Sequence, residues 1–111
     1  MRIVLCTCEP GDGARLLTAL LDDRLVAGGN IIPGLRSLYR WEGAIQDEPE
    51  ELLVMETADD RVEAMTARLR ALHPYEVPKI VTFDVKETLA DYLQWVREMT
   101  RPAQGAAPED R

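Results

Sequence analysis

The chain has 111 residues, 46% of them hydrophobic and 30% charged, and a formal net charge of −7 at pH 7. This length and composition predict one soluble domain with its own core, and the negative charge argues against nucleic acid or an anionic membrane as the main partner. No apolar run approaches the roughly 20 residues of a membrane span, and the first residues do not resemble a signal peptide. We therefore expect a cytoplasmic protein.

The first third predicts a strand, a turn and a helix. Residues 2–8 are apolar on both faces of a strand, so one face of the sheet should pack on helices and the other on a further layer, such as a neighbouring subunit. Asp12 is a candidate N-cap after the turn at residues 9–13. Leucines at helical spacing then predict a helix that ends at Gly28 and Gly29.

Residues 30–43 predict an unusually long strand. Residues 31–42 would span roughly 40 Å, whereas a compact chain of this size has a diameter of roughly 34 Å. Pro33 and Gly34 should bend the strand, because proline interrupts central pairing. We expect the segment to project beyond its own domain, with Tyr39 and Trp41 on an exposed edge that pairs with another chain. The alternative is an ordinary hairpin packed on its own core.

The remaining segments alternate between strand and helix patterns. The acidic residues 47–51 lead into a predicted strand at 52–55, and they suit either a solvated edge or a cation site. A helix should begin at Asp59 and Asp60, and a strand should cover residues 79–85. A last helix should begin near Thr88, capped by its side chain. The apolar stripes expected to pack are Val62, Met65, Leu69 and Leu72 in one helix, and Leu89, Leu93 and Val96 in the other.

The order of these elements predicts an α+β, ferredoxin-like βαββαβ fold with an extra C-terminal helix and an antiparallel sheet. Residues 1–100 should form a single domain, and residues 101–111 a disordered C-terminal tail, because they are rich in proline, alanine and glycine. Helices on one face of such a sheet leave the other face available for assembly.

This topology predicts a candidate metal site. The last strand should run antiparallel beside the first, which brings His73 near Cys6 and Cys8. Thiolate and imidazole are suitable ligands for copper or zinc, and Glu76 could add an oxygen. Two structural readings remain open: strand cysteines are often small buried hydrophobes, and a histidine before proline often caps a helix. A Cys–His nucleophilic pair is a further alternative, although no orienting residue is visible.

Four segments together resemble the CutA divalent-cation tolerance family. They are Asn-Ile-Ile-Pro-Gly at residues 30–34, Ser-Leu-Tyr-Arg-Trp-Glu-Gly at 37–43, Leu-His-Pro-Tyr-Glu-Val-Pro at 72–78 and Asp-Tyr-Leu-Gln-Trp at 91–95. The resemblance runs from about Ile3 to Val96. It implies a tight homotrimer, an association with tolerance of divalent metal ions, and a copper or other divalent metal site at Cys6 and His73. Taken together, these observations predict a non-enzymatic protein. Family members often carry a cysteine where this chain has Gly29, and some carry a second histidine where it has Leu72.

The architecture is also similar to the trimeric PII signalling proteins. This analogy suggests an alternative function, a signalling or adaptor trimer that binds a small organic anion or a partner protein in clefts between subunits. Plain interface packing is the competing explanation for the aromatic residues, and a small enzyme using His73 or Cys6 is a third reading. A shared sheet also predicts unusual heat resistance. The residues expected in the clefts are Tyr39, Trp41, Tyr75, Glu76 and Trp95.

Overall fold

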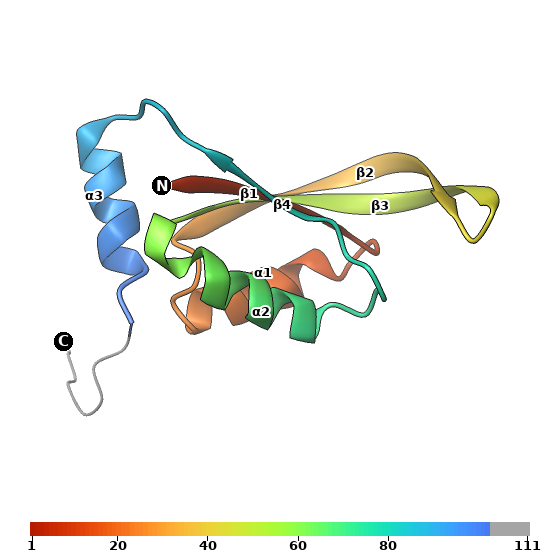
Figure 1. Ribbon diagram of the computed structural model, residues 1–111, viewed down its shortest axis with the longest axis horizontal. Helices are drawn as coiled ribbons and strands as arrows, with labels where there is room; N and C mark the ends of the chain where they lie inside the picture. Colours follow the sequence, from red (N-terminus) through yellow and green to blue (C-terminus); the bar gives the residue numbers. More distant parts are fainter. Residues whose placement is uncertain (103–111) are drawn as a thin grey trace.

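A computed structural model describes residues 1–102, in which a four-stranded antiparallel sheet is covered on one face by two helices (Figure 1). The strands lie in the order β2-β3-β1-β4, so the ferredoxin-like prediction is confirmed. The elements are β1 (Arg2–Cys8), α1 (Gly13–Asp22), β2 (Gly28–Trp41), β3 (Ala44–Thr57), a 3-10 turn (Asp59–Arg61), α2 (Val62–Leu72), β4 (Ile80–Asp84) and α3 (Ala90–Met99).

The core lies between the sheet and helices α1 and α2. Alternate residues of β1 point into it, and Cys6 and Cys8 are both fully buried there. The stripe predicted for α2 supplies Met65 and Leu69, which are also fully buried, while Leu72 packs at the margin. The two-residue period of β1 and the helical period of α2 therefore meet in one cluster, as the sequence predicts.

Strands β2 and β3 form a hairpin that extends far beyond the rest of the sheet (Figure 1). Each has 14 residues, but β1 pairs with β3 only from Glu51 to Thr57, so the outer half of the hairpin has no third strand. The chain measures 50 × 32 × 22 Å as a result. An irregularity between Ile32 and Leu35 marks the predicted bend, where Gly34 has a φ of +80°. The predicted overhang is thus confirmed.

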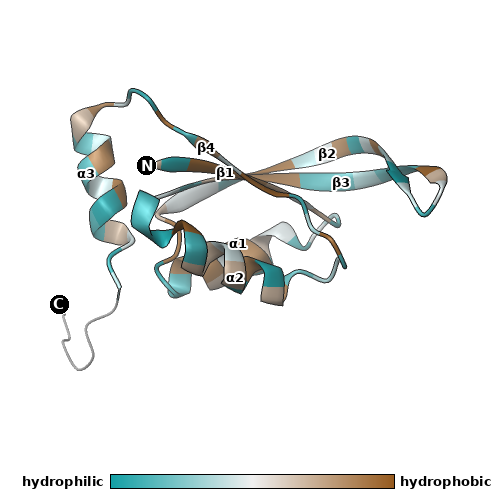
Figure 2. Ribbon diagram, viewed as in Figure 1, coloured by the Kyte–Doolittle hydropathy of each residue, from teal (hydrophilic) through white to brown (hydrophobic). Residues whose placement is uncertain are grey.

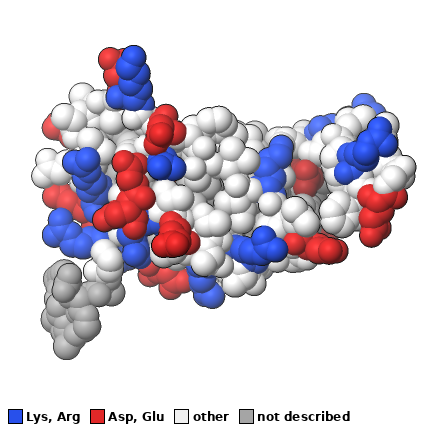
Figure 3. Space-filling view, viewed as in Figure 1, with Lys and Arg blue, Asp and Glu red and all other residues white. Residues whose placement is uncertain are grey.

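The face of the sheet opposite α1 and α2 is apolar and only partly covered. Leu5 pairs with Val81 on one side and Val54 on the other. Helix α3 contacts one end of this face, where Trp95 lies beside Gly28 and the Tyr92 hydroxyl donates to Glu56. Phe83 is 51% exposed on the same face. Figure 2 shows apolar segments running along β1 and β4, and Figure 3 shows charged side chains gathered at the α3 end and the hairpin end, with a largely uncharged band between them. Residues 1–102 therefore leave part of this face, including Val81 and Phe83, exposed.

Two helix boundaries differ from the prediction. Helix α1 ends at Asp22, and Gly28 and Gly29 begin β2 rather than ending the helix. A Cβ at Gly29 would lie 2.8 Å from Met55 Cγ and 3.1 Å from a backbone oxygen, so the glycine permits close packing there. Helix α3 begins at Ala90, and no side chain caps it, so the predicted cap by Thr88 is absent. Leu89, which the sequence predicts to pack, precedes the helix and is 71% exposed. The sequence predicts these glycines as helix terminators, whereas in the structure the small size of Gly29 is what the contact with Met55 needs.

The start of α1 is capped by a side chain of strand β3. Asp12 occupies the N-cap position, but its carboxylate binds Arg15 at 2.8 Å, and the backbone N–H of Gly13 donates to Glu51 Oε1 at 3.1 Å. Of the predicted tail, residues 103–111 lie outside the described residues. No helix within residues 1–102 is long and apolar enough to cross a membrane.

Candidate functional site

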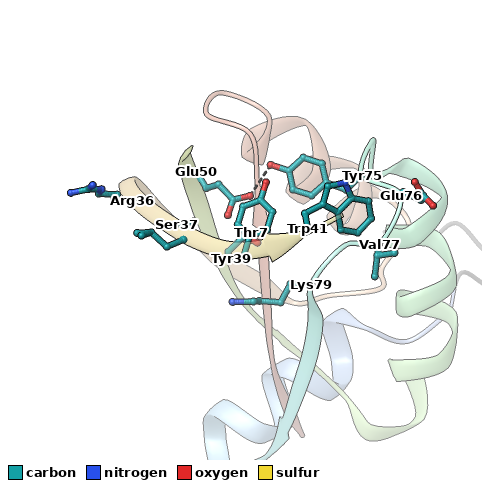
Figure 4. A pocket seen from close by; sticks show the side chains of 11 residues that line it. Thr7, Arg36, Ser37, Tyr39, Trp41, Glu50, Tyr75, Glu76, Val77 and Lys79 are labelled. Carbon is teal, nitrogen blue, oxygen red and sulfur yellow. Dashed lines mark hydrogen bonds between the residues drawn. The ribbon is translucent and has the colours of Figure 1, made fainter. Parts of the chain in front are cut away.

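A groove of about 610 Å³ lies at the base of the projecting hairpin (Figure 4). Its walls come from the outer part of β2, the end of β1, one residue of β3 and the loop between α2 and β4. Grooves of this volume, apolar with a few polar groups, are typical of small-molecule sites. The lining residues are Thr7, Arg36, Ser37, Leu38, Tyr39, Trp41, Glu50, Tyr75, Glu76, Val77 and Lys79.

Glu50 is the acidic side chain most deeply set in this groove, with 6% of its surface exposed. The Tyr75 hydroxyl donates to its Oε2 at 2.7 Å, as the dashed line in Figure 4 shows. Burial and this bond raise the pKa of Tyr75 far above its usual range. The Tyr39 hydroxyl donates to Glu48 at 2.6 Å, and that bond, with burial, raises the pKa of Tyr39 to about 12. Both phenols are therefore neutral hydrogen-bond donors at physiological pH.

His73 fastens the loop that carries Tyr75. Its Nε2 lies 2.8 Å from the Thr7 carbonyl oxygen, and its Nδ1 accepts the backbone N–H of Tyr75 at 3.2 Å. A backbone N–H only donates, so Nδ1 must carry the lone pair and Nε2 the proton. The imidazole also packs on the Tyr75 ring, with centroids 4.6 Å apart. Because both ring nitrogens are engaged, His73 acts here as a clasp between β1 and the groove wall.

Cys6 and Cys8 lie in the core beneath the sheet, with no exposed surface. Burial, followed by the neighbouring negative groups, raises the pKa of Cys6 to about 12 and that of Cys8 to about 11. Metal binding and nucleophilic attack both need the thiolate, which is scarce at such values. The predicted approach of the His73 loop to the end of β1 is present. Within residues 1–102, no group of three or more His, Cys, Asp and Glu side chains is placed to hold a metal ion.

Four acidic residues of β3 each have a different hydrogen-bond partner. Asp47 forms a bidentate pair with Arg36 across the hairpin, at 2.7 and 3.0 Å. Glu48 and Glu50 hold the two tyrosines of the groove, and Glu51 caps α1. The alternation of a strand sends neighbouring carboxylates to opposite faces, so they meet different partners. These acids therefore brace four separate contacts instead of forming one cluster.

Four of the five residues predicted for a cleft between subunits lie together within one subunit, and the cleft between subunits itself stays a prediction. Tyr39, Trp41, Tyr75 and Glu76 line the groove, although 36 positions separate the first from the third in sequence. Trp95 is not among its lining residues: it lies on α3, beside Gly28 at the opposite end of β2, with its ring 5.5 Å from that of Tyr92.

Sequence reasoning missed three polar members of the groove, Thr7, Glu50 and Lys79. Glu50 stands among other acids, so nothing in the pattern separates it from its exposed neighbours. Its role depends on the pairing of Glu50 with Leu35 and on the loop that brings Tyr75 to it. The one usable signal was the strand period of Thr7, which points opposite to Cys6 and Cys8.

Comparisons with known proteins place this geometry in a family. The family model described as "CutA1 divalent ion tolerance protein" matches residues 2–99. The divalent-cation tolerance protein CutA of Thermus thermophilus is 41% identical over 88% of this chain and 96% of its own length. The chloroplastic protein CutA 1 of rice is 37% identical over 80% of this chain, which spans about half of the rice protein.

Solved structures agree in fold. The Thermus thermophilus protein superposes with a TM-score of 0.86 at 41% identity, covering 91% of this chain and 100% of that one. A structure described as the PII-like protein CutA of Nostoc in apo form superposes with a TM-score of 0.87 at 31% identity, covering 93% and 100% of the two chains. The matched segment contains the long hairpin, the groove-lining loop and the last helix, and on this evidence the chain belongs to the CutA1 divalent ion tolerance family.

Proposed function

We propose that this protein is a non-enzymatic homotrimer of the divalent metal response, and that it works by binding a small molecule in the groove under the hairpin. The observation that carries the proposal is the groove itself, with three aromatic side chains and a nearly buried carboxylate at the base of a projecting arm. It combines the notion of a tolerance protein with the PII-like alternative. The protein would report on metal stress through a ligand instead of chelating the metal.

Assembly is supported by two surfaces that the subunit leaves incomplete. One is the open sheet face, where Val81 is 40% and Phe83 51% exposed. The other is the outer hairpin, where Leu38 is 61% and Ile45 67% exposed. Apolar surfaces of this kind mark protein interfaces, and an unpaired strand edge is a template for another chain. The number three follows from the family resemblance. Light scattering at low micromolar concentration should report three times the 12.5 kDa subunit mass, and a single-subunit particle would reject the assembly.

The non-enzymatic part of the proposal rests on the state of the nucleophiles and the base. His73 has both ring nitrogens in hydrogen bonds, and the thiols of Cys6 and Cys8 are buried and protonated. A general base needs a free lone pair within reach of a substrate. The His73 nitrogens have no free lone pair for this role, and the Cys6 and Cys8 thiols are not available as thiolate nucleophiles.

The ligand-response proposal is tested by thermal shift on the intact assembly. A panel of metabolites and divalent metal salts is added to the wild type and to Trp41→Ala, with Trp95→Phe as an aromatic control outside the groove. We expect at least one metabolite to raise the melting temperature of wild type and Trp95→Phe, and to lose its effect on Trp41→Ala. A flat response across a broad panel, or a response that survives Trp41→Ala, would count against the groove.

Direct copper binding by Cys6 and His73 is the second candidate. It is favoured by the family description and by the closeness of the His73 loop to the end of β1. Calorimetric titration with copper decides it, because binding through these groups would require His73 to release Tyr75 and the thiol to lose its proton. Weaker binding by both Cys6→Ser and His73→Ala would support the site, and equal affinity in all three proteins would reject it.

A further inference from the structure

We propose that the ligand of the groove is a small organic ammonium ion. This proposal rests on the proposed function, because it assumes that the groove is where the ligand binds, and it adds the chemical class. The class follows from three features of the groove: a carboxylate with no counter-ion, a set of aromatic rings and the position of the cationic side chains.

The carboxylate is that of Glu50, which is only 6% exposed. Its Oε2 accepts the Tyr75 hydroxyl. Its Oε1 has no protein hydrogen-bond partner within residues 1–102 and is not one of the buried unpartnered atoms, so it reaches solvent through the groove, and no described Lys, Arg or His nitrogen forms an ion pair with this carboxylate. A carboxylate that is mostly buried, with one oxygen open to a groove and no counter-ion, attracts a cation placed in that groove more strongly than a fully hydrated one does. Glu76 adds a second negative charge to the lining. The negative charge of the groove lining therefore favours binding of a positively charged group.

The aromatic rings decide which cation fits. Tyr39, Trp41 and Tyr75 line the same groove, and Figure 4 shows the Tyr39 ring and the Tyr75 hydroxyl next to the Glu50 carboxylate, with Trp41 beside Tyr75 on the side toward Glu76. In the single subunit Tyr39 is 41% and Trp41 37% exposed, so part of each ring faces the groove and the proposed neighbouring subunit. An alkylated ammonium gains from cation–π attraction and from burial of its methyl groups, whereas a hydrated metal ion gains neither. Metal ions also prefer several oxygen ligands, which this groove does not gather.

The positive side chains of the groove do not favour an anion. Arg36 is held by Asp47 through two hydrogen bonds of 2.7 and 3.0 Å, so its charge is already matched. Lys79 is exposed, and in Figure 4 it lies on the opposite side of the group from Tyr75. A small organic anion would gain Lys79 and would face the Glu50 carboxylate across the groove. An ammonium ion would instead be attracted by the Glu50 carboxylate and by the aromatic rings.

Choline tests the charge requirement against an uncharged molecule of the same shape, 3,3-dimethylbutan-1-ol. Both are titrated into the full chain carrying Trp95→Phe, in which Trp41 is the only one of two tryptophans left to report by fluorescence. We expect choline to change the Trp41 signal and to bind at least about tenfold more tightly than the alcohol, since cation–π attraction and a desolvated ion pair together exceed about 1.4 kcal/mol. The anion 3,3-dimethylbutanoate should give no change.

Two variants locate the effect. Glu50→Gln keeps an acceptor for Tyr75 and removes the charge, so choline should bind at least about tenfold more weakly. Glu63→Gln removes the same charge from an exposed position on α2 and should leave choline binding unchanged. Undiminished binding by Glu50→Gln overturns the proposal. The comparison of choline with the alcohol needs no change at Glu50, so it decides the charge requirement even if that variant does not fold.

The outcome also separates this proposal from the function on which it rests. If choline and its alcohol analogue bind equally, or the carboxylate binds best, the ammonium class is wrong. If at the same time a metabolite from the thermal-shift panel still depends on Trp41, the groove remains the ligand site. If choline leaves the Trp41 fluorescence unchanged and no metabolite in the panel loses its effect on Trp41→Ala, both proposals fail.

Discussion

Replacing His73 with alanine separates a clasp from a metal ligand. The substitution removes the hydrogen bonds at 2.8 Å to the Thr7 carbonyl and at 3.2 Å from the Tyr75 N–H, and it leaves both backbone groups without these partners. Thr7 is only 8% and His73 only 6% exposed, so water replaces these bonds poorly. Two such losses, at about 1–3 kcal/mol each and partly relieved by relaxation of the loop, give an expected destabilisation of about 2–4 kcal/mol.

The assay is guanidinium unfolding at one fixed protein concentration, because dissociation of the assembly contributes to the measured stability. His73→Gln should keep the donor to Thr7, and His73→Asn should keep the acceptor for Tyr75. Each should therefore recover about half of the loss. Copper affinity should be the same in all four proteins. A loss below about 0.5 kcal/mol in His73→Ala, or failure of both amides to recover stability, would refute the role of His73 as a clasp.

Three further predictions follow from packing, burial and assembly. Gly29→Ala should cost about 1–3 kcal/mol in the same unfolding assay, because its Cβ would meet Met55 at 2.8 Å; an unchanged midpoint would contradict this. Cys6 and Cys8 should resist iodoacetamide at pH 8 until guanidinium unfolds the protein. Their raised pKa values add that stability should fall as pH rises above the ordinary thiol value of 9.0, since only the unfolded state releases those protons readily; stability constant from pH 8 to 11 would argue against buried thiols. Melting should occur above the roughly 45–65 °C range of ordinary domains and should shift with protein concentration, as scanning calorimetry at two concentrations would show.

The candidate site could be predicted from sequence only in part. Tyr39 and Trp41 stood out because large aromatics on one face of an overlong strand have no obvious partner within the domain. Glu50 and Lys79 did not stand out, since a charged residue among others has no distinguishing pattern. Trp95 is predicted for the same cleft between subunits, and within one subunit it lies on α3, at the other end of β2 from the groove. Residue type alone carries no information on which end of a strand a helix will reach.

The sequence by itself determined the element order, the overhang of the hairpin and the buried stripes, because these depend on local periodicity and on chain length. The tertiary structure alone decided how each polar side chain is employed. Both ring nitrogens of His73 form hydrogen bonds to backbone groups. Burial raises the pKa of Cys6, so its thiol stays protonated, and Glu50 uses only one carboxylate oxygen in a hydrogen bond. Hydrogen bonding and desolvation depend on what lies within a few ångströms in space, and residues far apart in the chain supply those neighbours.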